Sequence, residues 1–241
     1  MFGLREDGRR GSRSSTVGIR TRPKVVSFQL RAGLRCAIAA EDGYSMRPIA
    51  GMARGMTVGV PPGQDTRPTS DRVRGAIFSS LGARVTEARV LDLYAGTGAL
   101  GLEALSRGAV GAVFVEHGRP ALVALRANLA EYRRRDPRPI TVTVEPRDVS
   151  VILLDLAEHN EQFDLIFADP PYGNEPQALL EAAALPQLLT ATGELVLESG
   201  ARDPLRMPDG WESTREAVYG DTRVTFLRRA AELRSTPCPA S

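Results

Sequence analysis

The sequence predicts an α/β fold built on an open, Rossmann-like sheet of seven strands, mostly parallel, whose last strands form an antiparallel hairpin. Two observations indicate this. From about residue 85 onward, short apolar runs alternate with longer helical patterns, as in repeated strand and helix units. The apolar strand at 90–93 runs directly into a glycine turn, and the strand at 163–167 ends in a polar turn. Ligands of such sheets bind beyond the carboxyl ends of the strands, so we expect both turns at one site.

Length and composition divide the 241 residues into one substantial core and a small appendage. Residues 1–45 are rich in Arg, Ser and Gly and have no sustained periodicity, so we expect a disordered extension or a misassigned start, with Met46 as the true beginning. Residues 46–84 are expected to form a basic hairpin and helix module, and 85–229 the main domain. Residues 230–241 are expected to be a tail.

The sequence does not indicate a membrane-spanning protein or a metal-binding site. No apolar run approaches the roughly 18 residues that a membrane span needs. Cys36 and Cys238 lie near opposite ends of the chain and form neither a metal pattern nor a disulfide framework. We therefore expect a protein of the reducing cytoplasm, without a metal and without a membrane partner, and we expect it to be a monomer.

The charge is distributed unevenly although its net is only +2. Residues 46–84 carry six basic and two acidic side chains, whereas residues 85–241 carry 16 basic and 23 acidic ones. A polyanionic partner would therefore dock against the N-terminal third. The candidate contacts are Arg54, Arg67, Arg72 and Arg74.

The basic module has its own expected structure. Short apolar runs at 48–50 and 56–60 flank Arg54 like two strands about a turn. A helix starting after Thr69 or Ser70 then presents an apolar stripe of Val73, Ala76, Ile77 and Leu81. This stripe leaves the arginines of the helix for solvent or phosphate.

The glycine turn after the first core strand points to a bound nucleoside. Gly96, Thr97 and Gly98 lead into a helix over 99–105, and the glycines allow the backbone to approach a ligand closely. Gly96 to Gly101 literally spell the dinucleotide fingerprint, which stays open as an alternative. Asp92, four residues before Gly96, suits instead a cationic ligand end such as the amino group of a methionine moiety.

Two further acids follow at the ends of the next strands. Glu116 ends the strand 112–116, 18 residues after Gly98, where a carboxylate can grip a ribose diol in either kind of nucleoside cofactor. Pro120 starts a helix that closes in an arginine triplet at 133–135. Asp148 follows the strand 140–144 and could accept a hydrogen bond from an adenine amine.

The fourth strand, 163–167, is followed by the motif that best indicates a reaction, Asp-Pro-Pro-Tyr at 169–172. An exocyclic base amine is a poor nucleophile, and two acceptors on its N–H groups would aim its lone pair at an incoming methyl group. The Asp169 carboxylate and the Pro170 carbonyl can supply these acceptors, while Tyr172 offers a flat face for a flipped base. The two prolines at 170–171 stiffen the turn and contribute no competing N–H.

The rest of the chain completes the sheet. A helix is predicted over 177–189 and a strand over 194–197. The runs at 213–218 and 223–227 flank a turn and form the final hairpin.

Three stretches together resemble one family. They are Arg-Pro-Thr at 67–69 within the helix entry 66–74, Gly-Ala-Leu-Gly-Leu-Glu-Ala-Leu-Ser-Arg-Gly at 98–108, and Asp-Pro-Pro-Tyr at 169–172. From about Arg47 to Arg229 the chain resembles the RsmD-type 16S rRNA (guanine(966)-N(2))-methyltransferases. It departs from their pattern at Gly75, where the family usually has Glu.

The resemblance implies a class I methyltransferase fold, S-adenosyl-L-methionine as methyl donor, and 16S rRNA or the small ribosomal subunit as partner. It implies that Asp92, Gly96, Thr97 and Gly98 hold the methionine end, Glu116 the ribose and Asp148 the adenine. The guanine would be held by Asp169, Pro170 and Tyr172. Two alternatives stay open: another Asp-Pro-Pro-Tyr amino-methyltransferase acting on DNA adenine or protein glutamine, and a non-catalytic ribosome assembly factor.

Overall fold

The computed structural model describes residues 71–171, 175–203 and 205–230, together with four glycines and Met56. The four glycines are Gly51, Gly55, Gly59 and Gly173. The predictions for residues 1–45, for most of the N-terminal hairpin and for nearly all of the C-terminal tail lie outside these residues.

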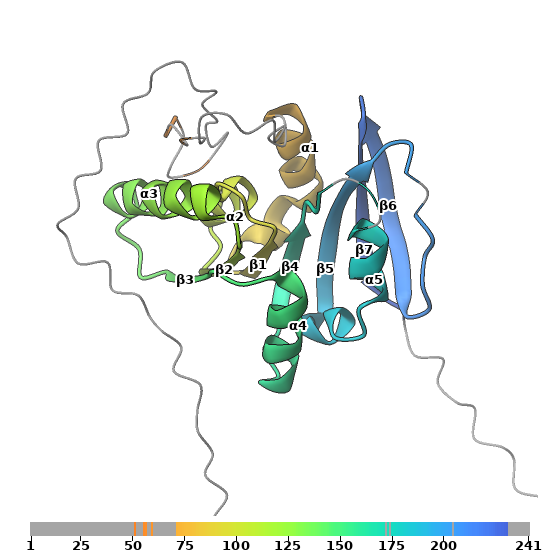
Figure 1. Ribbon diagram of the computed structural model, residues 1–241. Coiled ribbons are helices and arrows are strands. Elements are labelled where there is room, and N and C mark those ends of the chain that lie inside the picture. The colour runs from red at the N-terminus through yellow and green to blue at the C-terminus, as the bar shows by residue number, and fades with distance from the viewer. Residues whose placement is uncertain are drawn as a thin grey trace, which may run out of the picture.

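The described chain forms a seven-stranded sheet in the order β3-β2-β1-β4-β5-β7-β6 (Figure 1). Its strands are β1 (Arg89–Leu93), β2 (Gly111–Val115), β3 (Thr141–Glu145), β4 (Phe163–Ala168), β5 (Leu189–Gly200), β6 (Trp211–Tyr219) and β7 (Thr222–Arg229). The pairs among β1 to β5 are parallel, and β7 runs antiparallel to both β5 and β6. The predicted sheet is thereby confirmed, including the neighbouring positions of the first and fourth strands.

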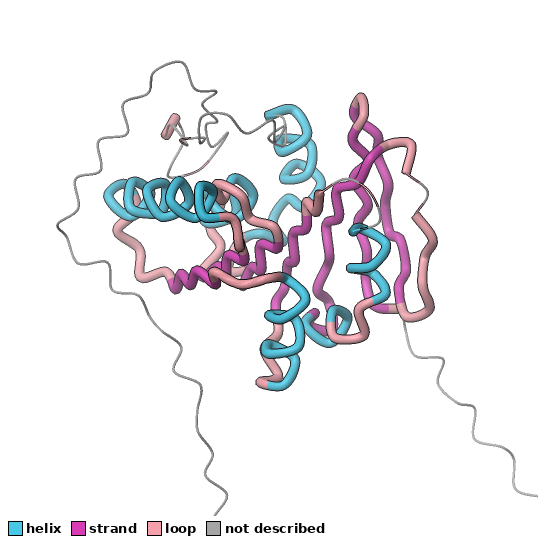
Figure 2. The backbone as a smooth tube through the Cα atoms, viewed as in Figure 1, coloured by secondary structure: helices cyan, strands magenta, loops and turns pink. Residues whose placement is uncertain are grey.

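Helices cover both faces of this sheet (Figure 2). They are α1 (Asp71–Leu81), η1 (Gly82–Val85), α2 (Ala99–Ser106), α3 (Arg119–Arg135), α4 (Val149–Glu158), α5 (Glu175–Glu181) and η2 (Leu185–Leu188). Buried side chains of α1, α2 and α3 share one core cluster with one face of the strands. Those of α4, α5 and η2 share the other. The strands β1, β2 and β4 and most of β5 are therefore buried on both faces, whereas the edge strand β3 is only partly buried.

Helix α1 lies on the same face as α2 and α3 and joins their core. Of the predicted stripe, Val73, Ile77 and Leu81 are buried, and Ala76 is partly buried. Its Phe78 ring packs against Phe167 of β4 with ring centroids 5.4 Å apart. Arg84, just beyond the helix, reaches Glu194, whose strand partner is Leu165 near the start of β4. The helix therefore runs antiparallel to the strands and begins toward their carboxyl ends.

Two helical features differ from the prediction. The helix expected over 177–189 is broken into α5 and η2, because Pro186 has no N–H to continue an α-helix and η2 forms around it. Helix α4 was not predicted at all. Its signal is a short apolar pattern of Val149, Ile152 and Leu153 after the capping residue Asp148, whose carboxylate accepts the Ser150 N–H.

Candidate functional site

The turn after β1 is shaped by two glycines with left-handed backbone, Gly96 (φ 54°) and Gly98 (φ 86°). A Cβ on Gly98 would lie 2.5 Å from a methyl carbon of Leu125, so the α3 face leaves no room for one. A Cβ on Gly101, the third residue of α2, would overlap the Phe114 ring, so this position also requires glycine unless the ring moves. Around Gly96, in contrast, the described residues bring only one atom near the position of an added Cβ, the Tyr94 carbonyl oxygen at 4.0 Å. The open side of the turn is therefore at Gly96.

Asp92 is held at the end of β1 beneath this turn. Its side chain is 2% exposed and accepts the backbone N–H of Gly101 at 2.9 Å. Burial raises the pKa of Asp92 to about 8, opposed by the Gly101 hydrogen bond and reinforced by the charges of Asp169 and Glu116. A buried carboxylate that is costly to ionise is a natural partner for a cationic ligand group.

Glu116 closes the other side of the turn. It directly follows β2, and its two carboxylate oxygens accept the N–H groups of Gly96 at 2.8 Å and of Gly118 at 2.6 Å. The structure thus brings Glu116 to the glycine turn across 20 residues of sequence. Each oxygen keeps a further acceptor position, so a diol could still bind to the same carboxylate.

Thr97 is fixed through its backbone rather than its side chain. Its carbonyl accepts an N–H of the Asn128 side chain at 3.0 Å, and Asn128 also accepts the N–H of Gly59 at 2.9 Å. This buried amide joins α3, the glycine turn and the N-terminal segment. Sequence reasoning missed Asn128; its signal is a polar residue within the apolar stripe of α3.

Asp148 lies at the carboxyl end of β3 but already has a local function. It caps α4 by accepting from the N–H of Ser150 at 2.8 Å and from its hydroxyl at 2.6 Å. These hydrogen bonds lower the pKa of Asp148, since they favour its ionised form. Its side chain is exposed at the same edge as the other acids and remains accessible to a ligand.

The Asp-Pro-Pro turn follows β4, immediately beside β1. Leu93 is paired with Ala168, so Tyr94 and Asp169 leave neighbouring strands at the same level. Asp169 is half-buried and Pro170 is buried, and the charge of Asp169 acts on Asp92. The structure therefore brings the fourth-strand motif to the glycine turn, as predicted from the strand order. Tyr172 lies outside the described residues.

Tyr94 was not among the residues singled out from the sequence. It has a left-handed backbone (φ 57°), which is uncommon for an aromatic residue, and its hydroxyl donates to Glu175 of α5 at 3.2 Å. Burial, followed by the charge of Glu175, raises its pKa. Tyr94 thus ties the end of β1 to the helix that follows the Asp-Pro-Pro turn.

The arginines proposed to contact a polyanion differ in their exposure to solvent. Arg72 is exposed on α1. The expectation that Arg74 is left for solvent or phosphate is wrong: it is 1% exposed and lies 3.7 Å from the carboxylate of Glu103, which is fully buried in α2. Glu103 also pairs with Arg107 at 2.6 Å. Arg54 and Arg67 lie outside the described residues.

The described residues contain neither a membrane-spanning helix nor a cluster of potential metal ligands. No helix in residues 71–171 or in the later described segments is long and apolar enough to cross a membrane. Among the same side chains, no group of three or more His, Cys, Asp or Glu could hold a metal ion.

Comparison with known proteins identifies the family. Residues 46–228 match a family model described as "Conserved hypothetical protein 95". The chain is 34% identical over 194 residues to "Ribosomal RNA small subunit methyltransferase D" of Escherichia coli K12, covering 78% of this chain and 91% of that protein. The protein of the same name from Haemophilus influenzae is 28% identical over 176 residues, covering 73% and 89% of the two chains.

A solved structure agrees with this match. A hypothetical protein from Thermus thermophilus has a TM-score of 0.64 and 32% identity, covering 76% of this chain and 99% of that one. The two turns at the carboxyl edge and these likenesses lead to one conclusion. The chain belongs to the "Conserved hypothetical protein 95" family, which is the RsmD family that its motifs resemble.

Proposed function

We propose that this protein transfers a methyl group from S-adenosyl-L-methionine to the exocyclic N2 amine of a guanine in 16S rRNA, within an assembled or partly assembled small subunit. One observation carries the proposal: the Asp-Pro-Pro turn of β4 lies directly beside the acidic glycine turn of β1, close enough for Asp169 to act on Asp92. A nucleoside cofactor and a base amine can thus be held at one edge. The names of the E. coli and H. influenzae relatives supply the ribosomal RNA substrate.

The residues of this edge fit the cofactor. A cationic amino group would offset the burial penalty on ionised Asp92, and the open space at Gly96 admits the ligand beside the Thr97 and Gly98 backbone. Glu116 would accept from the ribose hydroxyls and Asp148 from the adenine amine. When bound, the cofactor supplies a methyl group that is already activated for direct displacement, so no covalent enzyme intermediate is needed.

The chain's own contribution to the transfer is to orient and activate the amine. The Asp169 carboxylate and the Pro170 carbonyl accept its two N–H groups, while Tyr172 stacks on the base. The proton released after transfer passes to Asp169 or to water. Neighbouring strands hold these acceptors and the glycine turn at the same level, so the amine and the bound cofactor would meet at one edge of the sheet.

RNA recognition depends on few positive charges. Of the four arginines, Arg72 is exposed on α1 and Arg74 is committed to Glu103, while Arg54 and Arg67 complete the proposed set from the N-terminal segment. So few cations neutralise few phosphates, which predicts weak, salt-sensitive binding to unstructured RNA and recognition by the shape of a folded particle. A ribosomal substrate also makes the protein cytoplasmic.

The proposal is tested with Asp169→Ala. Removal of one of two amine acceptors should lower the rate of methyl transfer to small-subunit particles by about 100-fold or more, with the affinity for S-adenosylhomocysteine kept within a few-fold. Asp164→Ala is the matched control, because Asp164 lies at the opposite end of the same strand and accepts the Arg89 N–H at 2.9 Å. Near-normal turnover by Asp169→Ala would remove this residue from its role.

The substrate is tested separately. In rRNA from a strain that lacks this gene, mass mapping of modified guanines should show the loss of one N2-methylguanine from 16S rRNA. An unchanged 16S pattern would favour a DNA or protein substrate, or an assembly factor without catalysis.

A further inference from the structure

A second carboxylate, that of Glu198, lies at the carboxyl end of β5, next to the Asp-Pro-Pro turn. The parallel register pairs Phe167 with Val196 and Ala168 with Leu197, so the next step along both strands sets Glu198 beside Asp169. On its other side Glu198 is paired with Val224 of β7, which keeps it within the sheet. Glu198 is 3% exposed, an unusual position for an acid.

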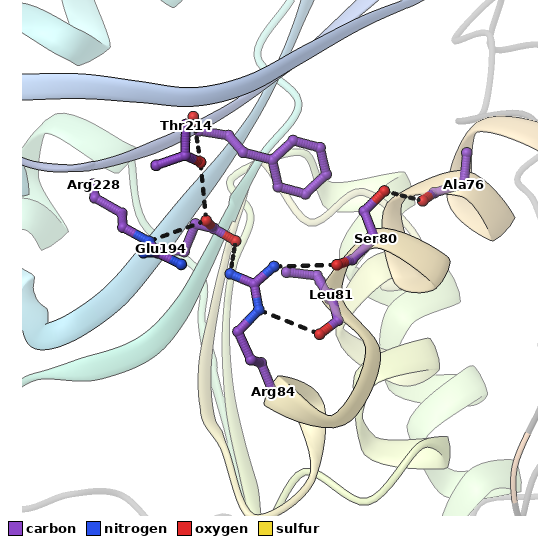
Figure 3. Close-up of polar contacts among 8 residues, drawn as sticks. Ala76, Ser80, Leu81, Arg84, Glu194, Thr214 and Arg228 are labelled. Atoms are coloured by element: carbon purple, nitrogen blue, oxygen red, sulfur yellow. Dashed lines mark hydrogen bonds and ion pairs between the residues drawn. The ribbon is translucent and has the colours of Figure 1, made fainter.

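Alternation along β5 gives the face on which this carboxylate lies. Residues two apart in a strand share a face, so Glu194, Val196 and Glu198 point to the same side. Glu194 contacts Arg84 on the α1 side of the sheet (Figure 3). Val196 belongs to the core cluster that includes Phe78 of α1.

Asp92 lies on this same face of β1, since it is paired with Phe167, whose ring packs against α1. Asp169 follows two residues after Phe167, and its charge raises the pKa of Asp92. The carboxyl edge thus presents three acids at the ends of three adjacent strands: Asp92 in β1, Asp169 directly after β4, and Glu198 in β5.

The Asp-Pro-Pro turn by itself does not determine which base is methylated. Its two acceptors engage only an exocyclic amine, and adenine, cytosine and guanine all have one. Guanine differs because its ring N1–H donor lies next to the 2-amine, so two donor groups stand side by side on its Watson–Crick edge. Adenine presents an acceptor at N1. A carboxylate beside the amine site therefore distinguishes the two bases.

We propose that Glu198 is the residue that selects guanine, by accepting the N1–H of the target base while Asp169 and the Pro170 carbonyl hold its 2-amine. This inference rests on the proposed function. A base with a lone pair at N1 would instead place that lone pair against a carboxylate oxygen, so that two acceptors face each other with no proton between them. A carboxylate accepts several hydrogen bonds at once, so other contacts of Glu198 are compatible with this one.

The test uses small-subunit particles reconstituted with rRNA that carries 2-aminopurine at the target position. This base keeps the 2-amine but has an acceptor at N1. The wild-type protein should methylate guanine about 1,000-fold more efficiently, in kcat/KM, than 2-aminopurine. In Glu198→Gln the side-chain amide can rotate and donate to N1, so the ratio should fall to within about 10-fold.

Glu194→Gln is the matched control. Glu194 is a buried acid on the same strand and face, but it pairs with Arg84 at 2.5 Å and with Arg228 at 3.3 Å and accepts from Thr214, four residues away from the proposed contact (Figure 3). Its substitution should leave the preference for guanine unchanged. If Glu198→Gln does not fold, Glu198→Ala replaces it, with the expectation that the guanine rate falls toward the 2-aminopurine rate.

Two results would overturn the inference: equal wild-type efficiencies on the two bases, or a wild-type preference that persists in the Glu198 variant. Failure of the proposed function looks different, because the wild-type protein would then methylate no guanine in the particle at all. Binding of S-adenosylhomocysteine, measured for every variant, should stay within a few-fold, since Glu198 is not placed at the cofactor.

Discussion

The buried acid Asp92 predicts an unusual dependence of stability on pH. Its pKa is about 8 in the folded protein and about 3.8 when exposed. Between these values the folded state holds a proton that the unfolded state has lost, so the free energy of unfolding decreases as the pH rises. The stability that protonated Asp92 contributes to the folded state is fully present below about pH 4, and it is lost as the pH rises through about 8.

The magnitude follows from the difference in bound protons. One extra proton in the folded state lowers the free energy of unfolding by about 1.4 kcal/mol per pH unit, or by about 2 to 3 kcal/mol between pH 5 and pH 7. Asp92→Asn keeps an oxygen that can accept the Gly101 N–H but cannot ionise. Relative to this variant, the wild-type protein should therefore lose stability over that range.

Urea unfolding of the ligand-free proteins at several pH values measures this difference. Parallel stability curves for wild type and Asp92→Asn would refute the argument that burial dominates the ionisation of Asp92. The same acid makes a second prediction for the complex: at pH 7, binding of S-adenosylhomocysteine should release nearly one proton, because its cationic amino group favours the carboxylate. Calorimetry in two buffers of different ionisation enthalpy measures the release, which Asp92→Asn should abolish.

Three further predictions concern stability and ligand choice. Glu103→Ala removes the buried carboxylate that faces Arg74 and should lower the free energy of unfolding by about 3–5 kcal/mol, whereas Glu131→Ala, at a partly exposed pair on α3, should cost less than about 1 kcal/mol. Equal losses in urea unfolding would contradict this assignment. In Gly101→Ala the new methyl group would push against Phe114, so S-adenosylhomocysteine binding should weaken more than 10-fold, by about 1.4 kcal/mol or more. Adding Phe114→Leu to this variant should recover part of the lost affinity. If no affinity is recovered, the Phe114 ring is not the obstacle. In thermal melts S-adenosylhomocysteine should raise Tm while NAD at the same concentration should not. Stabilisation by NAD alone would support the dinucleotide interpretation of the glycine turn.

Local patterns and one topological rule were enough to predict much of the fold. Apolar runs identified all seven strands of the described sheet, and the rule that ligands bind beyond the carboxyl ends near the switch point brought Gly96 and Asp169 together. These predictions succeeded because strand periodicity and glycine turns are properties of neighbouring residues. Asp92 was likewise assigned to the cofactor site from its spacing to the glycines, although the rise in its pKa depends on burial by other elements.

What the tertiary structure alone decided are the partners of polar side chains. An arginine on an amphipathic helix is expected in solvent, but Arg74 is buried and lies 3.7 Å from Glu103 of α2, nearly 30 residues later in the chain. Asn128 acquired its role from Gly59 and Thr97, which lie in other segments. Glu198 directly follows the strand predicted over 194–197 and was not singled out from the sequence; the register of β4 and β5 sets it beside Asp169. Strands, turns and the family motifs could be predicted because they depend on residues that are close in the chain. The burial and pairing of charges depend on which distant elements pack together, and packing is a property of the folded chain.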